Sequence, residues 1–131
     1  MPHLGITSFV YLVLLICGVI TSASATEDSI FIKFETENLI NGRTLWLDNC
    51  KGCHAYGTAG APVPMVSGEW EQRVIKDRVL LYNHAINGFF GADDTMMPAR
   101  GGNENLTDKQ VKLAVDYMVS LAKHYLNKQR K

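Results

Sequence analysis

The chain has 131 residues, of which 47% are hydrophobic, and this length suits a single globular domain. Its 13 Lys and Arg side chains balance its 13 Asp and Glu side chains. This balance argues against nucleic acid as the main partner, because phosphate binding depends on a surplus of cationic side chains. The charges are unevenly placed, since residues 1–25 carry none and residues 123–131 carry four cations and no acid.

An apolar run covers residues 9–20, and small residues follow it up to Ala25. Ala23-Ser24-Ala25 has the A-x-A pattern of a signal-peptide cleavage site, and the run is shorter than the about 20 residues of a membrane span. We therefore expect residues 1–25 to be a signal peptide and the chain to be exported to the periplasm. The segment lacks the usual Lys or Arg, so an uncleaved membrane anchor is the alternative. Cys17 does not indicate lipid attachment, because the preceding Ile16 is too large for a lipobox.

The remaining chain divides into a polar lead-in over residues 26–37, a single domain over 38–126 and a basic tail over 127–131. The first predicted helix covers residues 37–49. Its candidate buried positions are Leu39, Ile40, Trp46 and Leu47.

Gly42 lies inside this first predicted helix, where glycine costs about 1 kcal/mol relative to alanine. A glycine at this position suggests that another helix crosses closely. Trp46 follows one turn later on the same face. The sequence therefore predicts a helix crossing at Gly42.

Two long loops separate the remaining helices. Residues 56–68 are rich in Gly and Pro and predict the first loop. Residues 69–87 predict two short helices that change direction near residues 76–77, and Gly88 ends the second of them. Residues 91–105 predict the second loop, and the sequence shows no convincing strand pattern. Loops of this length are usually functional.

The last predicted helix opens at Thr107, which has capping-box spacing with Gln110. Apolar residues then recur with helical spacing along one stripe. The stripe consists of Val111, Ala114, Val115, Met118, Leu121, Ala122 and Tyr125. The predicted fold is therefore all-α.

Cys50-Lys51-Gly52-Cys53-His54 has the C-x-x-C-H spacing of c-type haem attachment. The two thiols must lie about one helical turn apart to bond the two vinyl groups of the porphyrin. His54 then lies under the iron as its proximal ligand. A Cys50–Cys53 disulfide is possible in an oxidising compartment. A thioredoxin-like pair would need a βαβ context, and a zinc site would need four ligands and a second Cys/His cluster; the sequence shows neither.

The sixth iron ligand is predicted to be Met97. It lies more than forty residues after His54, which lets the chain pass around the haem edge, and Pro98 favours an extended backbone beside it. Met96 is the alternative. Met65 is too close to His54 in sequence, and Met118 belongs to the apolar stripe of the last helix.

The histidines outside the motif are weaker candidates for the sixth ligand. His84 lies between apolar neighbours in a predicted helix, where a packed or surface role is the more common one. His124 lies near the basic tail and is expected to be solvated. Ligation by two histidines is therefore the less favoured alternative.

Several stretches together resemble the bacterial cytochrome c5 group of class I c-type cytochromes. They are residues 60–63 (GAPV), 80–89 (LLYNHAINGF) and 97–121 (MPARGGNENLTDKQVKLAVDYMVSL). The resemblance covers nearly all of residues 38–122. It implies a small class I cytochrome c fold in which the N- and C-terminal helices cross and one covalent haem lies between the two long loops.

The resemblance also implies roles for single residues. Met97 matches the axial methionine, and Pro62 matches the proline whose carbonyl accepts a hydrogen bond from the proximal His54. Trp70 and Arg100 are the candidates for contacting the haem propionates.

The resemblance implies, in addition, that Gly42, Trp46 and Tyr117 form the contact between the first and last helices. Residues 99–110 lack the further cysteine pair of some members, so no structural disulfide is expected.

These features predict a monohaem carrier of single electrons between periplasmic or membrane-bound redox complexes, and not an enzyme. We expect transient redox partners, possible docking to a membrane complex, and a monomer. Lys51, Lys76 and Arg100 would ring the docking face. The alternatives are a haem subunit of a larger oxidoreductase and a gas-binding haem protein with a labile sixth ligand.

Overall fold

The computed structural model describes residues 30–92 and 94–131, so the predicted signal peptide and Cys17 lie outside the described residues. The chain divides into two compact units, Met1–Ile32 and Lys33–Lys131, and every element named below belongs to the second. Among the described residues, no helix has both the length and the apolar character that crossing a membrane requires.

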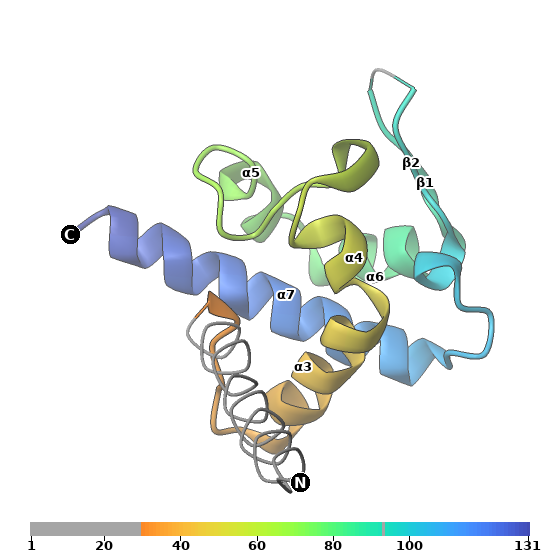
Figure 1. Cartoon of the computed structure of the whole chain (residues 1–131), viewed down its shortest axis with the longest axis horizontal. Coiled ribbons are helices and arrows are strands. Elements are labelled where there is room, and N and C mark those ends of the chain that lie inside the picture. Colours follow the sequence, from red (N-terminus) through yellow and green to blue (C-terminus); the bar gives the residue numbers. More distant parts are fainter. Residues whose placement is uncertain (1–29, 93) are drawn as a thin grey trace, which may run out of the picture. The chain divides into compact units, whose positions relative to one another are not determined.

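The described part of the chain is mostly helical, as the sequence predicts (Figure 1). Its α-helices are α3 (Glu37–Asn49), α4 (Lys51–His54), α5 (Glu71–Val74), α6 (Arg78–Asn87) and α7 (Asp108–Gln129). Two short 3₁₀ segments, η1 (Thr58–Gly60) and η2 (Ala99–Gly102), lie within the predicted loops. The predicted change of direction between residues 69 and 87 is confirmed: α6 begins after Asp77, whose side chain accepts a hydrogen bond from the Val79 N–H at 2.7 Å.

Helix α3 crosses α7 at Gly42, and this crossing forms the centre of the core (Figure 1). A Cβ atom on Gly42 would overlap the carbonyl oxygen of Leu113 and lie 3.1 Å from Cβ of Tyr117. One turn along α3, Trp46 packs on Tyr117 with 5.6 Å between ring centroids, and neither side chain is exposed. The predicted close approach of the first and last helices is therefore confirmed.

The prediction that Ile40 is buried is wrong, because 51% of this side chain is exposed. The crossing at Gly42 decides which side of α3 faces inward. At about 100° per residue, Trp46 lies about 40° from Gly42 around the helix, whereas Ile40 lies about 160° away. Ile40 therefore points to the opposite side of α3.

Helix α7 has the predicted start and a wider buried face than the predicted stripe. Thr107 and Gln110 form a complete capping box at its first turn. Tyr117, Val119 and Leu126 are buried in addition to most of the stripe, because α3, α5 and α6 all pack on this helix. Tyr125 is only half-buried, and the helix continues to Gln129, within the predicted basic tail.

A short antiparallel hairpin, which the sequence did not predict, joins α6 to the second loop. Strand β1 (Phe89–Phe90) pairs with β2 (Met96–Met97), and the register sets Phe89 opposite Met97. Two-residue strands are too short to show the alternation that predicts a strand. The hairpin nevertheless determines how Met96 and Met97 are presented.

Candidate functional site

The C-x-x-C-H motif lies at the junction of α3 and α4. Helix α3 ends at Asn49, and the backbone N–H groups of Cys53 and His54 donate to the Cys50 carbonyl at 3.2 and 2.9 Å. The two cysteines are therefore one turn apart, as attachment to two vinyl groups requires. Cys53 is exposed and Cys50 half-buried, and neither forms a disulfide with a described residue. Burial, with the neighbouring Cys53, raises the pKa of the Cys50 thiol to about 12.

His54 is buried, with 6% of its surface exposed, and its Nδ1 lies 3.0 Å from the Pro62 carbonyl oxygen. If Nδ1–H donates to this oxygen, Nε2 keeps the lone pair that binds a metal. Burial lowers the pKa of His54, the Pro62 carbonyl opposes this effect, and the positive charge of Arg73 lowers the pKa further. These effects together favour the neutral imidazole that can act as a ligand.

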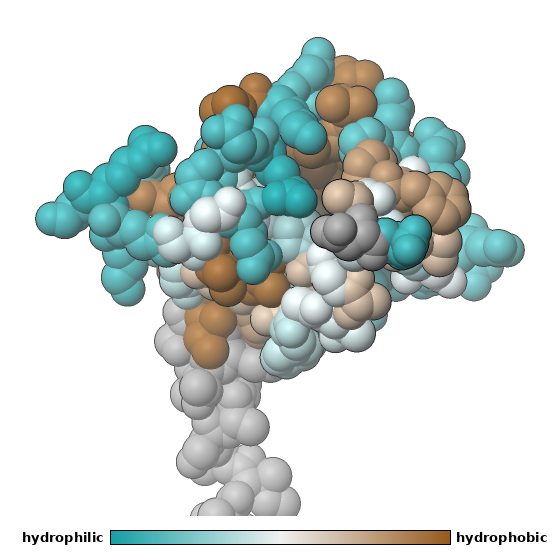
Figure 2. Space-filling view, turned by 90° about the horizontal axis from the view of Figure 1, so that it is seen from above, coloured by the Kyte–Doolittle hydropathy of each residue, from teal (hydrophilic) through white to brown (hydrophobic). Residues whose placement is uncertain are grey.

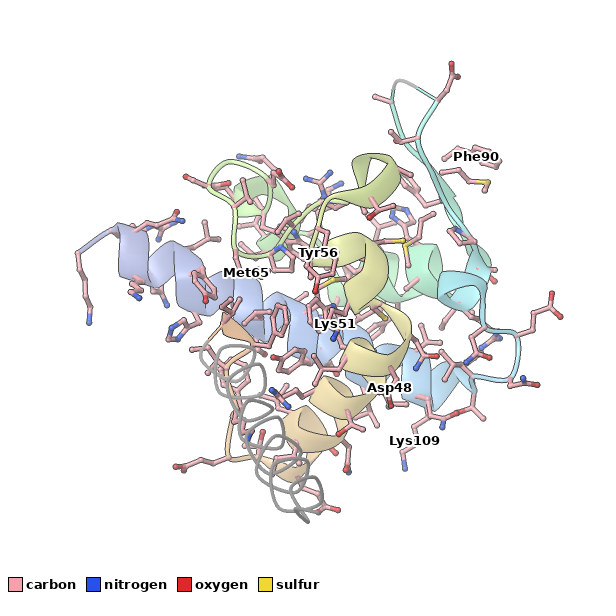
Figure 3. All side chains as sticks on the ribbon, viewed as in Figure 1. Asp48, Lys51, Tyr56, Met65, Phe90 and Lys109 are labelled. Carbon is pink, nitrogen blue, oxygen red and sulfur yellow. The ribbon has the colours of Figure 1, made fainter. Side chains whose placement is uncertain are left out.

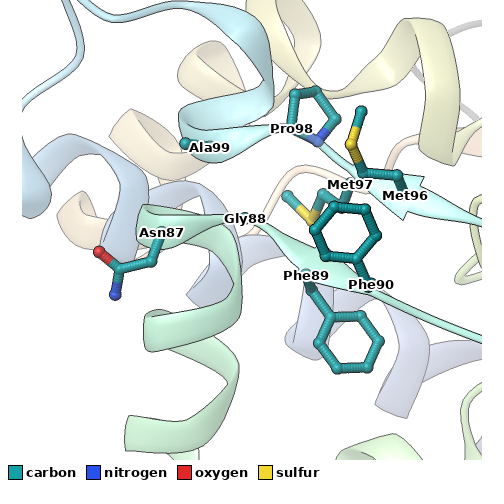
Figure 4. Close-up of a pocket in the computed structure, with 8 residues that line it drawn as sticks. All are labelled: Asn87, Gly88, Phe89, Phe90, Met96, Met97, Pro98 and Ala99. Carbon is teal, nitrogen blue, oxygen red and sulfur yellow. The ribbon is translucent and has the colours of Figure 1, made fainter.

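The hairpin of β1 and β2 determines how Met97 is placed. Gly88 lies between α6 and β1, where a Cβ atom would be 3.0 Å from the Met97 carbonyl oxygen. Successive strand residues point to opposite faces, and accordingly Met96 is 53% exposed while Met97 is half-buried. Figure 4 shows the two methionines on β2 beside Phe89 and Phe90. These residues help to line an open pocket of about 300 Å³.

Cys50, His54, Met97 and Arg100 line one common cavity. The apolar residues around it are Ala85, Leu106, Val111, Ala114, Val115 and Met118. An imidazole, a thioether and the Cys50 thiol around an apolar space, with the exposed Cys53 thiol one turn along the chain, fit a covalently bound haem. The cavity is narrow, about 20 Å³, so a haem bound there would hold its walls farther apart.

The other candidate ligands are placed elsewhere, except Met118, which is buried on α7 and lines this cavity. Met65 and Met96 are not among its lining residues. His84 stacks on Phe89 with 4.1 Å between ring centroids, and His124 packs edge-on against Tyr125 at 5.5 Å. Both histidines therefore have packing roles.

Trp70 and Arg100, the candidates for propionate contacts, differ in their hydrogen bonding. Trp70 is 3% exposed, and its Nε1 has no hydrogen-bond partner among the described residues. A buried donor of this kind fits an anionic acceptor, because leaving it unpaired is costly. The guanidinium of Arg100 already donates to the Leu106 carbonyl at 2.8 Å and to the Asp108 carboxylate at 2.6 Å.

The structure adds three polar residues that sequence reasoning missed. Asn103 donates from Nδ2 to Oδ1 of Asn49 at 2.7 Å, which ties the loop after Met97 to the residue before Cys50. The Glu69 carboxylate accepts from the backbone N–H of Val63 at 2.5 Å. No spacing pattern in a single sequence could reveal these contacts, because the first joins residues 54 positions apart and the second depends on how the loop between Val63 and Glu69 folds back.

Residues 37–118 match the protein family described as cytochrome c oxidase, cbb3-type, subunit III. The chain is 40% identical over 89 residues to cytochrome c-555 of Prosthecochloris aestuarii, covering 66% of this chain and 90% of that protein. It is 39% identical over 82 residues to cytochrome c-555 of Chlorobaculum tepidum, covering 63% and 75% of the two chains. Cytochrome c-555 of Chlorobaculum thiosulfatiphilum is 38% identical over 82 residues, with coverage of 63% and 94%. The matched family region contains every residue that lines the common cavity.

Proposed function

This chain belongs to the class I c-type cytochromes, and from that premise we propose that it carries single electrons through one haem with His54 and Met97 as axial ligands. Haem c, with its iron, is the cofactor of this family. Cys50 and Cys53 would hold it covalently. The observation that carries the proposal is the shared cavity, which His54 lines from α4 and Met97 from β2.

The bound haem would supply the one-electron chemistry, and the chain would supply binding, orientation and a dry environment. Imidazole and thioether ligands together favour a relatively high reduction potential and leave no open position for a substrate. The Pro62 carbonyl would fix the tautomer and ring plane of His54. A carrier, rather than an enzyme, is the function that this ligand set supports.

Trp70 and, more weakly, Arg100 would donate hydrogen bonds to the haem propionates. The Trp70 Nε1 donor is buried and available for a carboxylate. Arg100 donates to Leu106 and Asp108, but a guanidinium has five N–H donors, so it keeps some capacity for a propionate.

The partners would be redox proteins that bind transiently, as small interfaces allow. Seen from above, hydrophobic residues form several separate groups among hydrophilic ones, which suits a brief contact (Figure 2). Phe90 is 79% exposed on the hairpin and Lys51 lies on α4 (Figure 3), so we place the docking face around these elements. The chain would be exported, and intact mass would detect cleavage after Ala25.

Visible spectra of the purified protein and two methionine variants test the ligand set. The wild type should give a pyridine haemochrome of covalent haem and, when ferric, the weak red charge-transfer band of methionine ligation. Met97→Ala should lose this band and bind carbon monoxide rapidly when ferrous. Met96→Ala is the matched control and should keep the band. A wild type without the band, or a band that survives in Met97→Ala, would refute Met97 as ligand.

A second candidate function follows from the family description, which names a subunit of an oxidase. A haem subunit would purify in stable complex with the remaining subunits, whereas a free carrier would purify alone. Size-exclusion chromatography of the untagged protein from its native membranes and soluble fraction separates these two outcomes.

A further inference from the structure

We propose that Glu69 tunes the electron-donating strength of the His54 imidazole through the peptide group that joins Pro62 to Val63. The inference rests on the proposed role of His54 as the proximal ligand. Glu69 would act as a positioning residue, because its carboxylate bonds the Val63 N–H and reaches the imidazole only through the Pro62–Val63 peptide group.

One planar peptide group connects the two side chains. Its oxygen belongs to Pro62 and lies 3.0 Å from Nδ1 of His54. Its N–H belongs to Val63 and donates to Oε2 of Glu69 at 2.5 Å. Resonance couples the two ends of a peptide group. A carboxylate at the N–H end therefore makes the carbonyl oxygen more negative, and this oxygen accepts the hydrogen bond from the imidazole N–H.

The charge of Glu69 should strengthen the hydrogen bond at the other end. A hydrogen bond to an ionised acceptor is about twice as strong as a neutral one, and bonds in a chain strengthen each other by about 10–30%. A more negative Pro62 oxygen attracts the Nδ1 proton more strongly. The imidazole then offers more electron density at Nε2, which favours the ferric over the ferrous state.

The surroundings limit the screening of this effect and hold the carboxylate in place. Val63 is 8% exposed, His54 is 6% exposed and Pro64 is fully buried. The Glu69 main-chain carbonyl accepts a hydrogen bond from the guanidinium of Arg73, which belongs to α5. The backbone of Glu69 is thereby anchored while its side chain reaches back to the Pro62–Val63 peptide.

The test compares reduction potentials of the holoprotein in two glutamate variants. Glu69→Gln removes the charge but keeps an oxygen that can accept from Val63. We expect the redox equilibrium to shift about three- to tenfold toward the ferrous form, which is about 30–60 mV for one electron. Glu71→Gln removes the same charge two residues away. The Glu71 carboxylate accepts from Gly68 at 2.9 Å and not from Val63, so a much smaller shift is expected.

Spectroscopy of the proximal ligand distinguishes tuning from a purely structural role. The hyperfine-shifted NMR signals of the His54 ring should move in Glu69→Gln and stay near wild-type positions in Glu71→Gln, while both variants keep the red charge-transfer band. Equal potential shifts in the two variants would overturn the proposal in favour of a simple charge effect. An unchanged potential in Glu69→Gln, or loss of its band, would also overturn it. Failure of the proposed function is seen separately, in a wild type that lacks the band.

Discussion

Replacing Gly42 with alanine should destabilise the protein, although alanine is the better helix former. The helix propensity alone would favour alanine by about 1 kcal/mol. The new Cβ atom, however, would overlap the Leu113 carbonyl oxygen and crowd Tyr117 at 3.1 Å. The Leu113 carbonyl belongs to the backbone and cannot rotate away as a side chain could, so α3 and α7 must separate. Overpacking of this kind lowers stability by about 1–3 kcal/mol. The fully buried Trp46–Tyr117 contact would loosen as well.

We expect a net loss of about 2 kcal/mol in the free energy of unfolding, because the buried aromatic contact adds to the overlap. For a unit of about 100 residues this lowers Tm by about 8 °C. The assay is thermal denaturation of the ferric holoprotein, followed by far-UV circular dichroism. Gly52→Ala is the matched control, since a Cβ atom on Gly52 in α4 meets nothing within 4 Å. A Gly42→Ala protein as stable as the wild type, or an equal loss in Gly52→Ala, would refute the argument.

Three further predictions concern single polar contacts. Burial and the hydrogen bond to Asp116 raise the pKa of Tyr82 from about 10 to about 12, so the folded state holds this proton more tightly. The stability that the protonated Tyr82 contributes is complete below pH 10 and should be lost as the pH rises through 12. The Tm of Tyr82→Phe should therefore fall less steeply between these pH values than the Tm of the wild type. Trp70→Phe removes a hydrogen-bond donor and should raise the pKa of the haem propionate by about one unit. The measurement is the reduction potential as a function of pH, and an unchanged profile in the variant would count against the Trp70–propionate contact. Asn103→Asp sets two acceptors face to face and should loosen the loop after Met97, so imidazole should bind the ferric protein about fivefold faster. Asn105→Asp adds the same charge at an exposed neighbouring position and should leave this rate unchanged.

Apart from the helix crossing at Gly42, the features that the sequence predicts correctly depend on neighbours along the chain. Thr107 and Gln110 are three residues apart and form their capping box as expected. Cys50 and Cys53 lie one turn apart because α4 is a local helix. Such rules act within one or two helical turns, so a single sequence contains everything they need.

The features that the sequence missed depend on tertiary contacts. Ile40 is as apolar as the other candidate buried residues of α3, and only the crossing of α7 at Gly42 places it on the exposed side of the helix. The hairpin of β1 and β2 is too short for a periodic pattern, and its pairing needs Phe89 to meet Met97 across a loop. The contact of Glu69 with Val63 likewise needs the irregular loop between these two residues to fold back on itself.

By itself, the sequence determined the haem-attachment motif, with His54 directly after its second cysteine, and the helices, because these rest on short spacings. The sequence favours Met97 and keeps Met96 as the alternative, and the tertiary structure decided which of the two lines the cavity with His54. Strand pairing sets which side each methionine faces, and a shift of one residue would exchange them. Met97 also lies more than forty residues after His54 in the sequence, yet both line the same apolar cavity. Only the packing of α3, α6 and α7 brings the two residues to it.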